Sequence, residues 1–350
     1  MTVDQSTLAA VDPVGLRRFL GDHLPELQGP FDLKRLGEGQ SCLTFLVRGD
    51  GWEVVLRRPP RGDLPPTAFD VTREYRVMSA LSAAAPGVPV PTPLALCEDR
   101  SVIGAPFYLM ENVDGLVVRD QVPAALTSVE DRARMANQLL DTLVELHAVD
   151  WRAVGLESFG KPQGYLDRQV RRMSQLWGLA KFRAIPEIDE VGAWLAGRVP
   201  DQSAATIVHG DFKLDNAMFA PVSPARLIAV VDWEMSTIGD PLADLGWLLY
   251  FWRDPGDPEL GIRVASVTDL EGFPRRRDVL GRYAARSALP MDAIRWYVAL
   301  AGWKITIIME GSYRRFRAGI TDHADFARLD EAVPALARRA LQAANGELSL

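Results

Sequence analysis

The chain of 350 residues has few of the residues that mark disulfide-stapled or metal-binding proteins. Its two cysteines, Cys42 and Cys97, lie far apart without CxxC spacing, and its four histidines show no metal-ligand spacing. Neither a disulfide scaffold nor a zinc site is therefore indicated, although a single disulfide between the two cysteines stays open.

Long apolar runs and an excess of basic charge are missing as well. The N-terminus lacks the basic and apolar segments of a secretory signal. The most apolar late stretch, 296–309, is interrupted by Lys304 and is too short to cross a bilayer. The formal net charge of −7 argues against a nucleic-acid partner. We expect a cytoplasmic protein with no membrane partner, and the sequence leaves its oligomeric state open.

The hydrophobic periodicity predicts an α+β chain in two lobes. In the N-lobe, residues 1–111, alternation typical of strands dominates, and glycine or proline turns separate the strands. The expected elements are a helix at 13–23, three strands within 31–58, a helix at 68–83, and strands at 92–98 and 106–111. They predict a small antiparallel β-sheet with one main helix.

The C-lobe, residues 112–350, is larger and mainly helical. Apolar residues recur at helical spacing, and capping residues such as Ser128 and Asp240 stand at predicted helix starts. The expected helices are 128–147, 164–179, 191–198, 241–252, 275–288, 291–311 and 323–345. Short strands are expected between the third and the fourth of these helices.

The stretch 207–245 carries the residues that predict the chemistry. An apolar strand leads into an HGD triplet that ends at Asp211, Asn216 follows after four intervening residues, and a second strand delivers Asp232. Phosphoryl transfer from a nucleotide needs a carboxylate that orients the attacking hydroxyl, and an Asn and a second Asp that hold Mg²⁺. We therefore interpret Asp211 as the catalytic carboxylate, and Asn216 and Asp232 as magnesium ligands.

Neighbouring residues are expected to help or to support this set. Lys213 is placed to neutralise charge on the transferred phosphoryl group, and Glu234 to support a second metal ion or a water molecule. His209 and Asp244 are interpreted as supports of the catalytic loop, and Asp240 as a helix cap. Each residue alone has an ordinary alternative as a turn former or a surface charge. The spacing of the whole set favours phosphoryl transfer.

The N-lobe supplies a candidate phosphate-covering loop and a phosphate anchor. Gly37, Gly39 and Ser41 lie in a strand-to-strand turn, where glycine lets the backbone approach phosphate oxygens; the alternative is an ordinary hairpin turn. Arg57 ends the next strand, where kinases carry a lysine that pairs with a helix glutamate, here Glu74. An arginine keeps that charge, although the sequence does not decide between Arg57 and Arg58.

The last N-lobe strand runs into a polar linker. Its end, from Glu111 to Val113, would expose backbone N–H and C=O groups to the edge of an adenine. The alternative is a buried strand and turn, and the sequence does not separate the two.

These residues resemble the aminoglycoside phosphotransferase and choline kinase-like family, relatives of protein kinases. The matching motifs are the HGD-x-x-x-x-N loop, the strand that carries Asp232, and the GDP-x-x-D-L helix start at 239–245. VVLRRPPRGDLPPTAFDVTREYRVMSAL more narrowly resembles phosphotransferase domains fused to acyl-CoA dehydrogenases and their free-standing bacterial relatives, where an arginine at the Arg57 position is usual. The similarity covers about residues 30–320. It implies a two-lobed protein-kinase-like fold, ATP and Mg²⁺ as cofactors, with GTP still open, and a small-molecule hydroxyl as acceptor.

The acceptor is sought in the last three predicted helices, where cations outnumber acids and aromatic residues lie between them. The cations are Arg275, Arg276, Arg277, Arg282, Arg286, Arg295, Lys304, Arg314, Arg315 and Arg317. Such a surface suits an anionic, partly apolar acceptor such as a hydroxyacyl-CoA; the alternative is that the arginines are solvated and the aromatics form core.

Other functions stay open beside this one. The first is an aminoglycoside or macrolide antibiotic phosphotransferase, and the second is a non-catalytic nucleotide-binding module. A protein kinase is disfavoured, because Asp240 follows Asp232 within eight residues and leaves little room for an activation segment.

Overall fold

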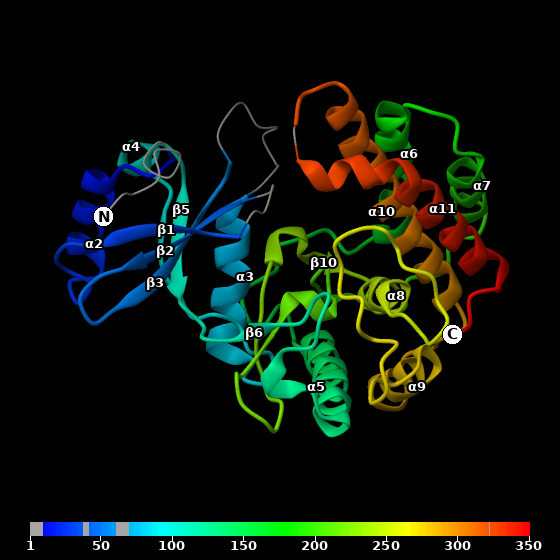
Figure 1. The fold of residues 1–350 in the computed structure, drawn as a ribbon, viewed down its shortest axis with the longest axis horizontal. Coiled ribbons are helices and arrows are strands. Elements are labelled where there is room, and N and C mark those ends of the chain that lie inside the picture. Colours follow the sequence, from blue (N-terminus) through cyan, green and yellow to red (C-terminus); the bar gives the residue numbers. More distant parts are fainter. Residues whose placement is uncertain (1–9, 38–41, 61–69, 322) are drawn as a thin grey trace. The chain divides into compact units, whose positions relative to one another are not determined.

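The computed structural model describes residues 10–37, 42–60, 70–321 and 323–350. The chain forms two compact units (Figure 1). Unit 1 comprises Met1–Asp114 and Ala229–Ser236, and unit 2 comprises Gly115–Ile228 and Thr237–Leu350. The sequence places the lobe boundary after residue 111 and does not predict the return of Ala229–Ser236 to unit 1.

Unit 1 contains the five-stranded antiparallel sheet that the sequence predicts, in the order β1-β2-β3-β5-β4. The strands are β1 (Asp32–Leu36), β2 (Leu43–Arg48), β3 (Glu53–Arg58), β4 (Pro93–Cys97) and β5 (Phe107–Glu111). The helices are α2 (Pro13–His23), α3 (Val71–Ala84) and α4 (Arg100–Ile103), with a 3-10 turn, η3 (Trp233–Met235). The short α4 is not predicted by the sequence. Asp70 caps α3 and Asp12 caps α2, as short acceptor side chains do.

The side chains of β3 point alternately to the two faces of the sheet in unit 1. Val54 and Leu56 join the apolar cluster that contains Leu16 and Phe19 of α2. Successive strand side chains point to opposite faces, so the residue at position 57 lies on the other face. There α3 contacts β4 and β5. This period of two decides which of two adjacent arginines reaches α3.

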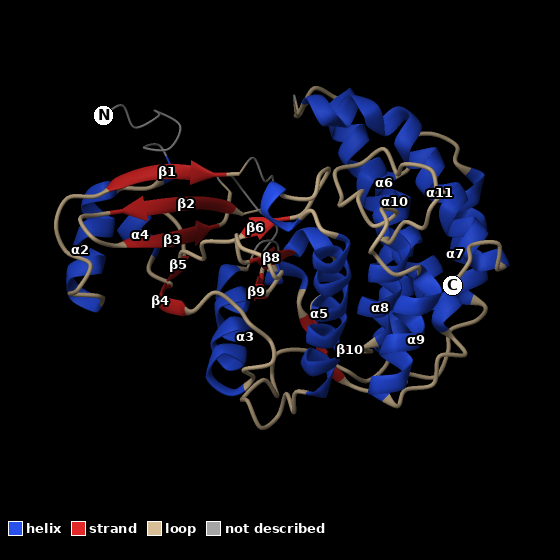
Figure 2. Ribbon diagram, turned by 60° about the horizontal axis from the view of Figure 1, so that its bottom comes forward, coloured by secondary structure: helices blue, strands red, loops and turns tan. Residues whose placement is uncertain are grey.

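Unit 2 is mainly helical, as predicted (Figure 2). Its helices are α5 (Val129–Ala148), α6 (Tyr165–Ala180), α7 (Pro186–Ala196), α8 (Leu242–Phe251), α9 (Arg276–Ser287), α10 (Ile294–Arg317) and α11 (Leu329–Asn345). Short 3-10 turns are η1 (Ala124–Leu126), η2 (Leu214–Asn216) and η4 (Ala324–Arg328). The predicted helix at 191–198 is wrong at its start, because Pro186 occupies the first turn of α7 and fixes a helical φ there.

Short strands connect these helices. β7 (Thr206–Val208) pairs with β10 (Thr237–Gly239), and β6 (Leu116–Val117) and β8 (Ala217–Phe219) belong to a sheet of order β6-β8-β9. β9 (Leu227–Val230) crosses the boundary between the two units of the chain.

Apart from Asp244, the helix α8 is apolar on all sides, which is typical of a buried helix. It packs against α10, which also contacts α6, α7 and α11. A Cβ atom at Gly246 would lie 2.6 Å from the carbonyl carbon of Tyr297, so only glycine lets α8 approach α10 so closely. No helix among the described residues is long and apolar enough to cross a membrane.

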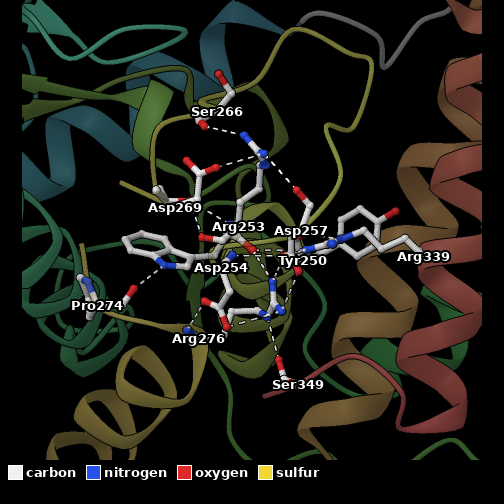
Figure 3. Close-up of polar contacts among 12 residues, drawn as sticks. Tyr250, Arg253, Asp254, Asp257, Ser266, Asp269, Pro274, Arg276, Arg339 and Ser349 are labelled. Atoms are coloured by element: carbon white, nitrogen blue, oxygen red, sulfur yellow. Dashed lines mark hydrogen bonds and ion pairs between the residues drawn. The ribbon is translucent and has the colours of Figure 1, made fainter. Parts of the chain in front are cut away.

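A buried network of charges joins the end of α8 to α9, α11 and the C-terminal residues (Figure 3). Arg276, 2% exposed, binds the Asp257 carboxylate and donates to the carbonyl of Ser349 at 2.7 Å. Arg339 donates to the same carboxylate at 3.2 Å. Burial opposes the charged form of Asp257, but the hydrogen bond from Arg276 holds its pKa below the usual value. Two guanidinium groups therefore depend on one carboxylate.

Replacing that carboxylate tests the network. Asp257→Asn is expected to lower the free energy of unfolding at pH 7 by about 2–3 kcal/mol, because it leaves buried guanidinium charge partly uncompensated beside Asp254. The depressed pKa gives stability that is present above the unfolded value near 4 and lost as pH falls through the folded value. Urea unfolding at several pH values measures both effects.

Asp141→Asn is the matched control, since Asp141 also binds two arginines, Arg282 and Arg286, but these are 36% and 42% exposed. The control is expected to cost less than about 1 kcal/mol. Equal losses for the two variants would show that burial of the Asp257 network contributes nothing special.

Candidate active site

A buried carboxylate on α8 shapes the loop that follows β7. Asp244 is fully buried and accepts hydrogen bonds from the backbone N–H groups of His209 at 2.7 Å and Gly210 at 2.8 Å. Gly210 has φ of +86°, a conformation that favours glycine. The ring Nδ1 of His209 accepts the backbone N–H of Asp211 at 3.2 Å. These bonds fix the backbone that carries Asp211.

The Asp211 carboxylate receives hydrogen bonds on both oxygens. Trp247 donates its indole N–H to Oδ1 at 2.8 Å, while Lys213 and Asn216 donate to Oδ2 at 2.5 and 2.8 Å. The Asp211 side chain is 18% exposed. A carboxylate accepts about four hydrogen bonds, so this one is held in place and can still accept a hydroxyl.

Asn216 is oriented by the same loop. Its side-chain N–H₂ group donates to the backbone carbonyl and to the carboxylate of Asp211, each at 2.8 Å. The amide oxygen makes no hydrogen bond with any residue that the structure describes. Asn216 therefore presents an oxygen, the atom type that Mg²⁺ prefers.

Asp215, which the sequence does not single out, lies beside these residues. Its carboxylate is 3.8 Å from Lys213 and lines a cavity of about 10 Å³, enough for about one water molecule. Oδ1 is buried without a hydrogen-bond partner among the described residues. Burial raises the pKa of Asp215 to about 6, against the opposing charge of Lys213. Its place next to Asn216 is the only sequence signal for it.

The carboxylate of Asp240 makes its hydrogen bonds with residues other than Asp211. It is fully buried and accepts from Ser203, from the hydroxyl of Tyr297 at 3.0 Å and from the backbone N–H of Leu242 at 2.9 Å. It thus holds the first residue of α8 in place. Through α8 it supports Asp244, which lies in the first turn of that helix.

In unit 1, the structure brings Arg57 together with Glu74, Asp232 and Glu234. Arg57 lies 2.7 Å from Glu74, 2.7 Å from Asp232 and 3.6 Å from Glu234. Tyr108, opposite Arg57 in the sheet, donates its hydroxyl to Glu74 at 3.0 Å. Burial alone would favour neutral arginine, yet Glu74 and Asp232 hold the pKa of Arg57 well above its usual value. Arg57 is therefore a fixed positive charge.

The neighbouring Arg58 lies on the other face of the strand. It donates to the backbone carbonyls of Pro59, Ala10 and Ile103, the last at 3.3 Å. The alternation of β3 thus separates the two arginines. Of the two, Arg57 is the one that meets the α3 glutamate.

Asp232 lies just before η3, and Glu234 lies within it. Asp232 has φ of +70°, unusual for a residue other than glycine, and such strain often occurs at functional sites. Its Oδ1 accepts from Arg57, while Oδ2 makes no hydrogen bond with a described residue. The side chain is 36% exposed. Asp232 therefore also has a carboxylate oxygen that can bind a cation.

Donor atoms of Cys42, Glu74 and Glu234 lie within 4.8 Å of one another in unit 1. Burial raises the pKa of the Cys42 thiol above its usual value, so the sulfur keeps its proton. A protonated thiol is a poor metal ligand, and Arg57 already supplies positive charge to both carboxylates. We therefore assign no metal ion to the Cys42 sulfur.

The remaining nucleotide candidates are placed only in part. Gly37 has φ of +70° at the end of β1, a conformation typical of a turn glycine, while Gly39 and Ser41 lie outside the described residues. Glu111 donates its backbone N–H to Thr92 at 2.9 Å, so that group is occupied. The backbone of Val113 makes no hydrogen bond with any described residue.

The cations of the last helices are mostly engaged or solvated. Arg276 is buried with Asp257, Arg282 and Arg286 bind Asp141, and the other arginines of the set are exposed. Most of the aromatic residues between them are buried: Trp296, Tyr297, Trp303 and Tyr313. The aromatic residues thus mainly form core, which is the alternative that the sequence leaves open. Lys304 differs from the arginines, since it is half-buried and lies 5.4 Å from the ring centre of Trp247.

Comparisons with known proteins identify the family to which the chain is similar. The model of a family described as the phosphotransferase enzyme family matches residues 32–279. The chain is 38% identical over 309 residues to acyl-CoA dehydrogenase family member 10 of Mus musculus, covering 87% of this chain and 28% of the relative. It is 34% identical over 342 residues to acyl-CoA dehydrogenase family member 11 of Rattus norvegicus, covering 95% of this chain and 43% of the relative. The chain thus spans less than half the length of these relatives.

Solved structures are similar over nearly the whole chain. A protein of Ralstonia eutropha JMP134, provisionally described as an aminoglycoside phosphotransferase, is 32% identical with a TM-score of 0.81, covering 96% of this chain and 99% of that one. A thermostable mutant of the aminoglycoside phosphotransferase APH(4)-Ia, in complex with AMP-PNP and hygromycin B, is 17% identical with a TM-score of 0.59, covering 93% and 98%. At that identity the second likeness concerns the fold alone.

The Arg57–Glu74 pair gives a stability prediction for unit 1. Arg57→Met is expected to lower the free energy of unfolding by about 3 kcal/mol, because it leaves the buried Glu74 without its cation. Glu74→Gln in the same chain should restore part of this loss, with a coupling energy of about 1–3 kcal/mol. A double-mutant cycle by urea unfolding measures the coupling.

Arg48→Met serves as the control, since Arg48 pairs with Glu53 in the same sheet but is 60% exposed. Its loss is expected to stay below about 0.5 kcal/mol. Purely additive effects of Arg57→Met and Glu74→Gln would contradict the pairing.

Proposed function

Because the chain belongs to the phosphotransferase enzyme family, we propose that it transfers the γ-phosphoryl group of ATP to a hydroxyl group of a small molecule. The observation that carries this proposal is the Asp211 carboxylate, which Trp247, Lys213 and Asn216 hold through three hydrogen bonds. Phosphoryl transfer depends mainly on positioning and on charge stabilisation. A carboxylate fixed before the substrate arrives meets the first need.

Asp211 would accept a hydrogen bond from the hydroxyl group of the small molecule and orient the hydroxyl oxygen toward the phosphorus atom. Lys213, 2.5 Å from this carboxylate, would neutralise negative charge on the transferred group. His209 and Asp244 act through the loop backbone, since the side chain of each accepts a hydrogen bond from a backbone N–H group. They are positioning residues.

The proposed magnesium ligands are Asn216, Asp232 and Glu234. The amide oxygen of Asn216 and one carboxylate oxygen of Asp232 make no hydrogen bond with described residues, so both fit a hard cation. Bound Mg²⁺ neutralises charge on the β- and γ-phosphates. Lys213 and Arg57 supply positive charge beside the proposed ligands, so the chain itself offsets part of the carboxylate charge.

For the nucleotide, Arg57 is the proposed phosphate anchor, positioned by Glu74. Gly37, Gly39 and Ser41 are proposed to cover the phosphates, and the backbone from Glu111 to Val113 to bind the base. The open backbone groups of Val113 support the last assignment. The same backbone contacts suit ATP or GTP, and ATP is the proposed donor.

For the acceptor we propose a hydroxyacyl-CoA-like anion. Two relatives of this chain carry the name acyl-CoA dehydrogenase family member, and a segment like this chain makes up less than half of each. Each of these relatives thus contains a segment like this chain together with further sequence, under a name that refers to acyl-CoA. An acyl-CoA with a hydroxyl group would suit both.

Phosphorylation of an aminoglycoside is the second candidate, because the structure with a TM-score of 0.81 carries that provisional description. The two candidates differ in charge: aminoglycosides are polycations, and a hydroxyacyl-CoA is an anion. Steady-state assays with 3-hydroxybutyryl-CoA and with kanamycin separate them. Transfer to kanamycin alone would replace the first candidate with the second.

Asp211→Asn tests the reaction itself. The variant is expected to lose at least about 10³-fold in kcat while binding ATP with little change, because the side chain then lacks the charge that orients the hydroxyl. Coupled detection of ADP release and calorimetric titration with ATP measure the two quantities.

Asp201→Asn is the control, an exposed aspartate shortly before β7. It should keep wild-type kcat. If wild-type protein and the Asp211→Asn variant bound ATP equally and neither consumed it, the chain would be a non-catalytic nucleotide-binding module.

A further inference from the structure

Lys304 is a cation of unit 2 that carries a charge without a matching acid at contact distance. It is half-buried in α10 and makes no hydrogen bond or ion pair with any residue in the described part of the chain. Its ammonium lies 5.4 Å from the ring centre of Trp247. Removing an ammonium from water without a hydrogen-bond acceptor is unfavourable, and contact with an indole face offsets only part of that.

The indole links Lys304 to the catalytic carboxylate. Trp247 belongs to α8 and donates its indole N–H to Asp211 Oδ1 at 2.8 Å. Lys304 is therefore one side chain away from the residue that is proposed to orient the acceptor hydroxyl. Among the ten cations that the sequence assigns to the acceptor side, Arg276 is buried with Asp257, while Lys304 has no such partner.

The charges around Lys304 come from several elements. Asp244 of α8 and Asp211 of the loop favour its charged form, and Arg172 of α6 opposes it. Arg172 is itself exposed and makes no hydrogen bond or ion pair with described residues. Two cations on neighbouring helices, α6 and α10, thus lack an ion pair with any described residue.

We propose that Lys304 is a specificity-determining residue, which binds a negatively charged oxygen of the acceptor while Asp211 orients the hydroxyl, and which disfavours cationic acceptors. The proposal rests on phosphoryl transfer at Asp211. The negatively charged oxygen would accept a hydrogen bond from the Lys304 ammonium, which has no such partner among the described residues. A cationic molecule would be repelled at the same place.

The negative oxygen has two sources in the acceptors considered. It belongs to the carboxylate of a free hydroxy acid, or to the phosphates of coenzyme A in a hydroxyacyl thioester. Four acceptors distinguish these sources: 3-hydroxybutyrate, 3-hydroxybutyryl-CoA, the neutral ethyl ester of 3-hydroxybutyrate, and choline as a cation. The anion whose kcat/KM falls when Lys304 is replaced identifies the source.

Lys304→Met is expected to lower kcat/KM for the preferred anion by about 10- to 100-fold, as loss of a charge-assisted hydrogen bond does. Most of the change should appear in KM. The value for the neutral ester should stay within about twofold. Lys304→Glu should raise the preference for choline over the anion, and Lys304→Arg should keep the wild-type preference.

Arg338→Met is the matched control, an exposed cation of α11 in the same unit. It should leave the kcat/KM of all four acceptors unchanged. Circular dichroism melting of each variant shows whether it folds. If Lys304→Met does not fold, Lys304→Arg still allows the role of the ammonium to be tested.

The pH profile adds a second readout. Burial lowers the pKa of Lys304 to about 8, so the ammonium loses its proton as pH rises through that value. In wild type, KM for the anion should rise between pH 7 and 9.5, and in Lys304→Arg it should not.

The outcomes separate two failures. Transfer by wild type with an unchanged acceptor preference in Lys304→Met and Lys304→Glu overturns the role of Lys304 alone. A loss of equal size for charged and neutral acceptors shows a structural role and also overturns it. No transfer to any acceptor by wild type overturns the proposed function and this inference together.

Discussion

The arrangement of unit 2 depends on one buried carboxylate, that of Asp244. Removing a carboxylate from water is unfavourable unless hydrogen bonds replace its hydration. Asp244 receives such bonds from the backbone of His209 and Gly210, and it lies in the first turn of α8, where the helix dipole favours negative charge. The chain after β7 has to bend around this group, and the bend sets the place of Asp211.

The position of Asp244 in turn depends on helix packing. Because Gly246 has no side chain, α8 lies close against α10, and Trp247 of the same helix reaches the Asp211 carboxylate. The carboxylate, its indole donor and the ammonium of Lys304 therefore come from three separate parts of the chain. Preorganised groups of this kind need little rearrangement during the reaction, which is how such sites stabilise developing charge.

Unit 1 uses the same principle with opposite sign. Arg57 is nearly buried, and Glu74 and Asp232 surround it, so its charge is permanent and its orientation is fixed. An arginine holds this place well because its planar guanidinium binds two carboxylates at once. In both units most buried charges are paired. The Asn216 amide oxygen and the Lys304 ammonium make no hydrogen bond with a described residue, and we assign a ligand to each.

Much of this could be predicted from the sequence, because it depends on local patterns. Alternation predicts the five-stranded sheet, and the spacing of Asp211 and Asn216 predicts the loop, since both residues lie within one short segment. The choice between Arg57 and Arg58 needed the register of β3, which a shift of one residue would reverse. Trp247 could not be found this way, and Lys304 could be named only as one of ten candidate cations, because 36 and 93 residues separate them from Asp211 and only tertiary packing brings them near.

We propose that the chain moves a phosphoryl group from ATP to a hydroxyl oxygen. The most direct measurement is phosphorus NMR of the products after incubation with ATP, Mg²⁺ and a hydroxyacyl-CoA. We expect a new phosphate monoester resonance that grows in step with ADP and is absent without the acceptor. Inorganic phosphate as the only new phosphorus product, or no ADP at all, would contradict it.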